Sequence, residues 1–421
     1  MRKPFSSIAI GFILLTTVVL PSLVLMIFHT SSVAVGILLV SVLYIILFAV
    51  LSAIWPQSQS LGAGSHLSIT VMGVIMIHST ISFLINDIFD FGRFLQSYLF
   101  LIIYIMGAFS FTLLVQRVPK FQTDFVVKLV FYVLFLSSIA GILDFSPFSS
   151  DQNKPVFFFF EPSQFALGFL PFLLYMVIVS NPRVKLLLLL LGYVIALLLE
   201  NMTLTVGITI IVGLMIPLRR VLFLAPIVII LIFFTATNLE YYSSRVDISN
   251  DSPNLSTLVY LSGWERAYLN FEETSGLGVG FQQFGIIGSR GEKMRSVEML
   301  AGVDLNLFDG GATASKFIAE FGLLGVLMLL AYLVYFAKSA RWLREISMHG
   351  VGSRECTKVF FLSCFVMYCI DFFIRGTGYF SSSGFFFVAS LLWMAAGGQS
   401  DKVFYRGWHL IKIWPQSKKS T

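Results

Sequence analysis

The chain has 421 residues, of which 57% are hydrophobic and only 12% are charged, and its mean hydropathy is +0.88. Soluble domains carry about 25% charged residues, so this composition excludes an ordinary soluble globular protein. The net charge of +6 and the pI of about 9.1 indicate membrane topology rather than binding to nucleic acid, because the basic residues gather in particular loops between apolar segments.

Long apolar segments recur along the chain, each close to the roughly 20 residues that a helix needs to cross a bilayer. Because no backbone N–H or C=O group can stay unpaired in lipid, we expect these segments to be helices. The predicted fold class is an all-α polytopic membrane protein with about 12 transmembrane helices and one large extracytoplasmic loop. The predicted spans cover approximately residues 5–28, 33–54, 67–86, 94–115, 125–143, 163–180, 184–199, 201–217, 221–238, 313–337, 358–374 and 382–397.

Two of these predictions need comment. The first apolar segment follows Arg2 and Lys3 and is too long for a cleaved signal peptide, so we expect a retained first span. The seventh and eighth segments are short and meet at residues 199–201. They form either two short spans or one re-entrant pair. A re-entrant pair would reduce the number of spans by two, so every later loop would remain on the side predicted for it.

Lysines and arginines set the predicted orientation, because they accumulate on the cytoplasmic side of a membrane protein. With the N-terminus inside, the inner segments hold most of the 28 basic residues and few of the 22 carboxylates. We therefore expect both termini in the cytoplasm. The chain then divides into the first nine spans (1–238), a large outer, periplasmic loop (239–312), the last three spans (313–397) and a basic cytoplasmic tail (398–421).

The predicted outer loop has its own local signals. Residues 256–271 place apolar side chains at helical spacing, which predicts a helix. The run from Gly276 to Gly280 then ends this pattern, and since no βαβ unit surrounds it, it does not match a dinucleotide-binding fingerprint. We expect a tight turn that returns the chain to the membrane. The loop contains neither Cys nor His, so we predict no metal ion and no cofactor.

Glu161 opens the sixth span together with Pro162, which the first turn of a helix tolerates. This span runs from outside to inside, so the carboxylate stands at the positive end of the helix dipole. One interpretation is a helix-start signal with an N-terminal acid. The other is a functional carboxylate, because Glu161 follows four phenylalanines, where a charge without a role is costly.

Arg93 and Arg375 lie at outer span ends, against the general charge bias. The structural alternatives are an i,i+4 pair between Asp371 and Arg375 and a pair of Arg93 with Asp87 or Asp90. Neither alternative is favoured over a role in a binding site.

Three arginines of the outer loop, Arg245, Arg266 and Arg290, are the better candidates for an anion site. The loop carries more acidic than basic residues, so it does not attract anions diffusely. An anion site must then consist of individually placed arginines, whose planar guanidinium groups bind phosphate oxygens in pairs. We interpret four other polar groups as structural pairings or helix-terminal residues, namely His78, Glu200, Lys316 and Glu320.

Three short motifs in this order resemble the bacterial Wzy polysaccharide polymerases and the related O-antigen ligases. They are Glu161-Pro162-Ser163-Gln164-Phe165-Ala166, Trp264-Glu265-Arg266-Ala267 leading into Gly276-Leu277-Gly278-Val279-Gly280-Phe281, and Arg375-Gly376-Thr377-Gly378-Tyr379-Phe380. The topology is similar over the whole chain, but the motifs cover few residues, and their order and sidedness carry the resemblance.

The resemblance implies a glycosyltransferase that acts on undecaprenyl-diphosphate-linked oligosaccharide at the outer face of the bacterial inner membrane, without a metal ion. It also implies the lipid bilayer and a Wzz-type chain-length regulator as partners. Glu161 is then the general base or holds the acceptor, and Arg266 stabilises the transition state. Arg245 and Arg290 bind the diphosphate with Arg266, helped by Arg93 or Arg375.

Two departures from the family pattern matter. The related ligases use a histidine in the large outer loop, and residues 239–312 contain none, which favours a polymerase over a ligase. Some polymerases carry Arg-x10-Gly repeats, but the three loop arginines are followed eleven positions later by Ser256, Leu277 and Ala301.

The alternative functions are an O-antigen ligase and, from another class, a flippase for lipid-linked oligosaccharides. A flippase would show two similar halves and charges along a path through the membrane.

Overall fold

The computed structural model describes residues 5–29, 32–54, 62–117, 120–147, 154–215, 254–350 and 355–396. These residues form thirteen helices and, apart from two isolated β-bridges, no β-structure. Eight of the helices are long and apolar enough to cross a membrane, and α8 and α15 are shorter apolar helices. The part of the chain that is described is therefore all-α, and its helices are those of a multi-pass membrane protein. The predicted ninth span, residues 239–253 of the predicted outer loop with Arg245, and the basic tail lie outside the described residues.

The helices are α1 (Phe5–Phe28), α2 (Ala34–Ile54), α3 (Gly62–Ile85), α4 (Phe91–Arg117), α5 (Lys120–Ile142), α6 (Pro162–Val179), α7 (Pro182–Leu198), α8 (Met202–Met215), α11 (Leu255–Glu273), α12 (Glu292–Ala301), α13 (Thr313–His349), α14 (Cys356–Phe373) and α15 (Ser382–Ala395).

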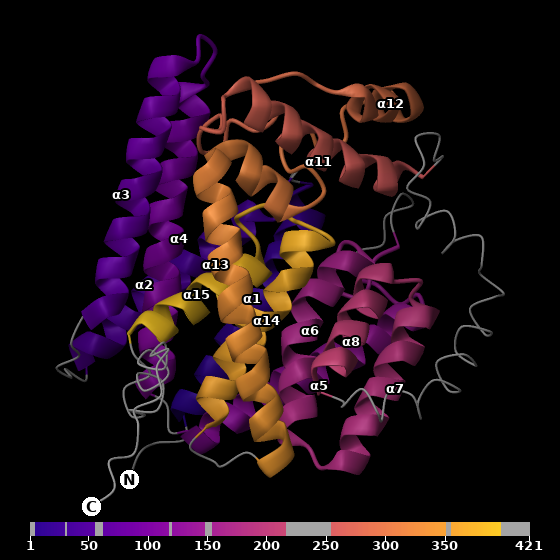
Figure 1. The fold of residues 1–421 in the computed structure, drawn as a ribbon. Coiled ribbons are helices and arrows are strands. Elements are labelled where there is room, and N and C mark those ends of the chain that lie inside the picture. Colours follow the sequence, from indigo (N-terminus) through magenta and orange to yellow (C-terminus); the bar gives the residue numbers. More distant parts are fainter. Residues whose placement is uncertain are drawn as a thin grey trace, which may run out of the picture.

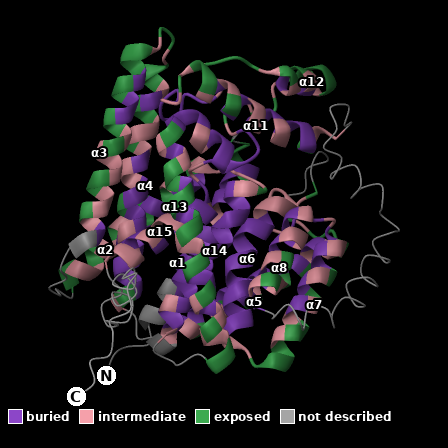
Figure 2. Ribbon diagram, viewed as in Figure 1, coloured by how far each residue is buried: buried purple, intermediate pink, exposed green. Residues whose placement is uncertain are grey.

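Helices α6 and α14 form the centre of the bundle and pack against each other (Figures 1 and 2). Their apolar windows are 78% and 89% buried, whereas that of α3 at the edge of the bundle is only 17% buried. Because lipid is as apolar as leucine, exposed apolar side chains on α3 are compatible with a position facing the bilayer. The centre of the bundle therefore joins segments from the middle and the end of the chain.

Helices α7 and α8 are separate helices that pack against each other. The chain turns between them at Glu200, which has a positive φ of 49°, and Asn201 begins α8 by accepting from Leu204 N at 3.0 Å. The Asn201 amide also donates to Pro162 O at 2.6 Å. This junction therefore lies beside the start of α6, where the sequence places Glu161.

Helices α11 and α12 lie across one end of the bundle (Figure 1). The predicted helix at 256–271 is confirmed as α11, and it begins after Asn254, whose side chain accepts from Ser256 N and Thr257 N. Helix α12 was not predicted, because its short sequence has few apolar residues. It packs on α11 through the small cluster Leu258, Val259, Met294 and Val297.

Helix α13 is interrupted at Gly322, which has φ 55° and ψ −130°. The interruption frees backbone groups, and the glycine turn 276–280 binds them: Val279 N donates to Ala319 O at 3.0 Å and Gly280 N to Glu320 O at 2.9 Å. In return, Leu323 N donates to Gly276 O at 2.8 Å. The predicted turn is therefore correct, but its partner is a broken helix that the sequence pattern presented as one continuous span.

Candidate functional site

Five of the six predicted site residues are described, and they lie at the end of the bundle that α11 covers. Glu161 precedes α6, Arg93 lies in the first turn of α4, Arg375 follows α14, Arg266 lies on α11, and Arg290 precedes α12. These residues enter separate polar arrangements there, and those of Glu161, Arg375 and Arg93 join elements that are far apart in the sequence.

Glu161 and Arg375 form an ion pair. Arg375 Nη2 lies 3.3 Å from Glu161 Oε1 and 3.5 Å from Oε2, and both side chains are about three-quarters buried, at 30% and 26% exposure for Glu161 and Arg375. Ser163 Oγ also donates to Glu161 Oε1, while the carboxylate makes no capping bond to the helix backbone. The predicted helix start is confirmed, because Glu161 is the N-cap residue of α6 and Pro162 begins the helix. The carboxylate itself, however, faces a cation 214 positions away.

The predicted structural alternative for Arg375, an i,i+4 pair with Asp371, is wrong. Asp371 is fully buried, and its two oxygens accept from the hydroxyl groups of Thr313, Thr377 and Ser383. These donors belong to the start of α13, the loop after α14 and the start of α15. Because Arg375 lies in that loop, Asp371 fixes the backbone that presents its guanidinium to Glu161.

The side chain of Arg93 contacts the loops on either side of α12 rather than Asp87 or Asp90. Its Nε donates to Gln282 O at 2.9 Å, and its guanidinium lies 4.0 Å from the centre of the Phe308 ring. Asp90 instead accepts from the Arg93 backbone N–H at 2.8 Å. Arg93 therefore fastens α4 to the loops on either side of α12.

Arg266 is buried under α11, with 3% of its surface exposed. Its guanidinium lies 5.3 Å from the centre of the Phe284 ring, and its Nη1 donates a long hydrogen bond of 3.5 Å to Leu307 O. Burial lowers the pKa of Arg266, the charge of Arg290 lowers it further, and Asp304 and Glu273 oppose both effects. The guanidinium remains charged. Among the described residues no carboxylate lies within ion-pair distance of it, which costs several kcal/mol.

Asn270 lies one helical turn after Arg266 and is fully buried, yet neither atom of its side-chain amide has a hydrogen-bond partner among the described residues. The Arg266 Nε atom and the Asp304 Oδ1 atom are in the same condition. Each such group costs about 1–3 kcal/mol. Three neighbouring side chains with unused hydrogen-bonding atoms are a feature of a binding site rather than of a packed core.

Arg290 is half exposed and binds acidic neighbours. Its Nη1 lies 3.2 Å from Asp304 Oδ2 and 3.6 Å from Glu298 Oε2. It therefore sets the position of Asp304. Among the described residues, no carboxylate forms an ion pair with both Arg290 and Arg266.

Lys316 and Glu320 form a buried network that sequence reasoning treated only as structural pairing. Lys316 Nζ lies 3.0 Å from Asp309 Oδ1, 3.5 Å from Gln282 Oε1 and 4.9 Å from the centre of the Tyr379 ring. Glu320 accepts from Tyr379 Oη at 2.8 Å. The signal was present, because a Lys and a Glu four residues apart inside an apolar span mark a functional or structural centre.

Replacing Asp309 with asparagine is expected to destabilise the folded protein by about 2 kcal/mol, because it removes the carboxylate that forms an ion pair with the buried Lys316. Asp309 itself is 44% exposed, which reduces the effect below that of a fully buried pair. The matched control is Glu298→Gln, which removes one half-exposed partner of Arg290 and should cost at most about 0.5 kcal/mol. Thermal unfolding of the purified variants measures both values, and equal losses would contradict the argument.

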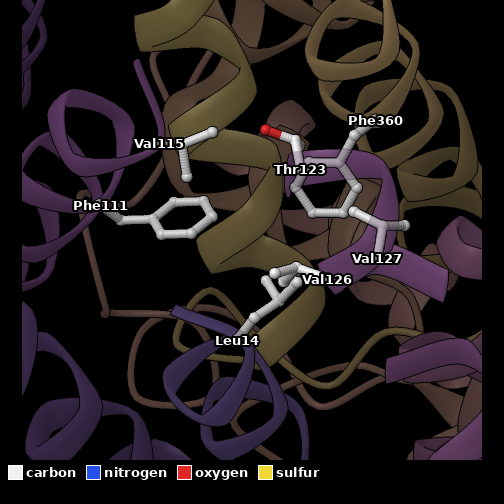
Figure 3. A pocket seen from close by; sticks show the side chains of 7 residues that line it. All are labelled: Leu14, Phe111, Val115, Thr123, Val126, Val127 and Phe360. Carbon is white, nitrogen blue, oxygen red and sulfur yellow. The ribbon is translucent and has the colours of Figure 1, made fainter. Parts of the chain in front are cut away.

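The cavities of the bundle are small. The one in Figure 3 is lined almost entirely by apolar side chains, including Leu14, Phe111 and Phe360, and holds only about 10 Å³. A second, of about 30 Å³, is lined by apolar side chains together with polar groups of α1, α6 and the loop after α14, among them Ser22, Gln164 and Thr377. Neither is large enough for a sugar, but the second borders the elements that carry Glu161 and Arg375.

No group of three or more His, Cys, Asp or Glu side chains with metal-binding geometry occurs in the part of the chain that the structure describes. Comparison of the chain with protein-family profiles, curated proteins and solved structures finds no match. The functional interpretation therefore depends on the residues themselves.

Proposed function

We propose that this protein is a polysaccharide polymerase of the Wzy type, which transfers a lipid-diphosphate-linked glycan onto a new undecaprenyl-diphosphate-linked repeat unit. The observation that carries the proposal is the ion pair between Glu161 and Arg375, together with the buried Arg266 at the same end of the bundle. Two of the three motifs that resemble the family thus meet in one contact, and the third covers the same end.

The proposed chemistry needs two kinds of group. The acceptor hydroxyl attacks the anomeric carbon of the donor, the bond from that carbon to the diphosphate oxygen breaks, and the hydroxyl proton passes to a base. Glu161, held by Arg375, is the proposed base. Arg266 and Arg290, with Arg245, stabilise the charge that develops on the leaving diphosphate. Arg93 holds the outer segment in place rather than binding the diphosphate, in view of its contacts with Gln282 and Phe308.

The proposal includes a topology of about 12 spans in the bacterial inner membrane, with both termini in the cytoplasm and residues 239–312 in the periplasm. Under this arrangement α11 and α12 face the compartment where a lipid diphosphate presents its glycan. A Wzz-type regulator is the proposed protein partner, and no cofactor is required.

A deletion strain tests the function. Loss of the polymerase should abolish the ladder of long glycans on gels while single repeat units still reach their final acceptor. Loss of a ligase would instead remove all attached glycan and leave lipid-linked polymer, and loss of a flippase would trap the repeat unit on the cytoplasmic side. An unchanged ladder would refute the proposal.

A further inference from the structure

Helix α11 is covered on one side by a segment that we call the outer strap, residues 285–311. Glycines with positive φ stand at both ends of it, including Gly285 at 89° and Gly310 at 64°. Two acids of α11 hold its middle: Glu265 accepts from Glu292 N and Lys293 N at 3.0 and 2.8 Å, and Glu273 accepts from Ser289. The strap therefore rests on α11 through these hydrogen bonds, one small apolar cluster and the close approach of Gly310 to Gly263.

The space between α11 and the outer strap gathers hydrogen-bonding atoms without partners. Arg266 and Asn270 are separated by one helical turn, so they share the buried face of α11. Asp304 lies on the strap close enough to act on the charge of Arg266, with Oδ2 bound to Arg290 and Oδ1 unbound. Gly288 closes the side of the group, because a Cβ atom there would overlap the Asn270 amide and lie 3.1 Å from Glu273 Oε2.

We infer that Arg266, Asn270 and Asp304 form one binding site for a glycosyl phosphate. Arg266 Nε and Asn270 Nδ2 are donors and bind phosphate oxygens. Asp304 Oδ1 is an acceptor and binds a hydroxyl group of the attached sugar. None of the acids around the site forms an ion pair with Arg266, because Asp304 and Glu298 pair with Arg290, and Glu273 accepts from Ser289.

The identity of the ligand as a lipid-diphosphate-linked sugar rests on the proposed function, whereas the site itself rests on the three side chains. Since all four unbound atoms are buried, the ligand reaches them only when the outer strap moves away from α11.

The test is binding to the full-length protein in nanodiscs, with two probes: undecaprenyl diphosphate, and the same lipid carrying one hexose. Asn270→Ala should weaken the binding of both lipids by about tenfold or more. Asp304→Asn should remove the extra affinity for the hexose-bearing lipid relative to the bare lipid, so that the ratio of the two dissociation constants falls to about one. Glu272→Gln, on the exposed face of α11, is the matched control and should bind both lipids like the wild type.

A second measurement does not depend on the folding of these variants. In Met299→Cys the new thiol lies on the exposed part of the strap, since Met299 is 79% exposed, and the three native cysteines are buried. Undecaprenyl diphosphate should change its rate of maleimide labelling, because binding repositions the strap. Wild-type affinity of Asn270→Ala together with an unchanged labelling rate would overturn the inference and leave buried water as the partner of these atoms.

The two proposals fail separately. If the deletion strain keeps its glycan ladder but Asn270→Ala loses lipid binding, the site stands and the polymerase function is wrong. If the ladder is lost on deletion but Asn270→Ala binds both lipids normally, the function stands and this site is wrong.

Discussion

Glu161→Gln is expected to lower the rate of polymerisation by about 10²–10⁴-fold, the usual contribution of a positioned general base. The amide has nearly the same shape as the carboxylate, so the variant should insert and accumulate normally. The glutamine amide cannot act as the base that accepts the proton, and the substitution replaces the ion pair with Arg375 by a weaker hydrogen bond. Cells should accumulate glycolipid with a single repeat unit in place of long ladders, which gel electrophoresis measures directly.

Arg375→Met and Glu200→Gln provide the comparison for this prediction. Removing Arg375 should impair the same step, because the base is then no longer held in place. Glu200 lies near the start of α6 and forms an ion pair with Lys154 at 2.8 Å, but Lys154 is 79% exposed. Glu200→Gln should therefore leave the ladder intact. Normal ladders in Glu161→Gln would remove this carboxylate from the mechanism.

Gly322→Ala is expected to destabilise the protein by at least about 3 kcal/mol and to reduce its folded abundance several-fold. Gly322 has φ 55° and ψ −130°, a conformation that residues with a Cβ atom rarely adopt. A Cβ atom there would also overlap the carbonyl oxygens of Gly276 and Leu277. Both effects would displace the glycine turn from the broken helix.

Gly73→Ala is the matched control for Gly322. It also lies in a membrane helix, α3, but its Cβ would meet no atom within 4 Å. Alanine is preferred over glycine in helices by about 1 kcal/mol, so this change should be neutral or slightly stabilising. Thermal unfolding of the purified proteins compares the two, and similar melting temperatures for both variants would show that the interruption of α13 is not required.

The sequence by itself determined the class of fold. Apolar segments long enough to span a bilayer must be helical, because lipid offers no partner for backbone groups, and this holds whatever the helices pack against. It also determined the helix now seen as α11 and the turn at residues 276–280, since both depend on local spacing and on glycine. Glu161 and Arg375 were identified as unusual for a similar reason, because a charge at an apolar span end is costly.

Only the tertiary structure decided which charges meet. The local pattern offered Asp371 as the partner of Arg375, four residues away, but Asp371 binds three hydroxyl groups and Arg375 pairs with Glu161. The break in α13 and the buried Arg266 and Asn270 were likewise hidden, because hydropathy does not reveal which face of a helix another segment covers. Ion pairs and buried amides depend on contacts between distant segments, and such contacts are set by packing rather than by sequence neighbours.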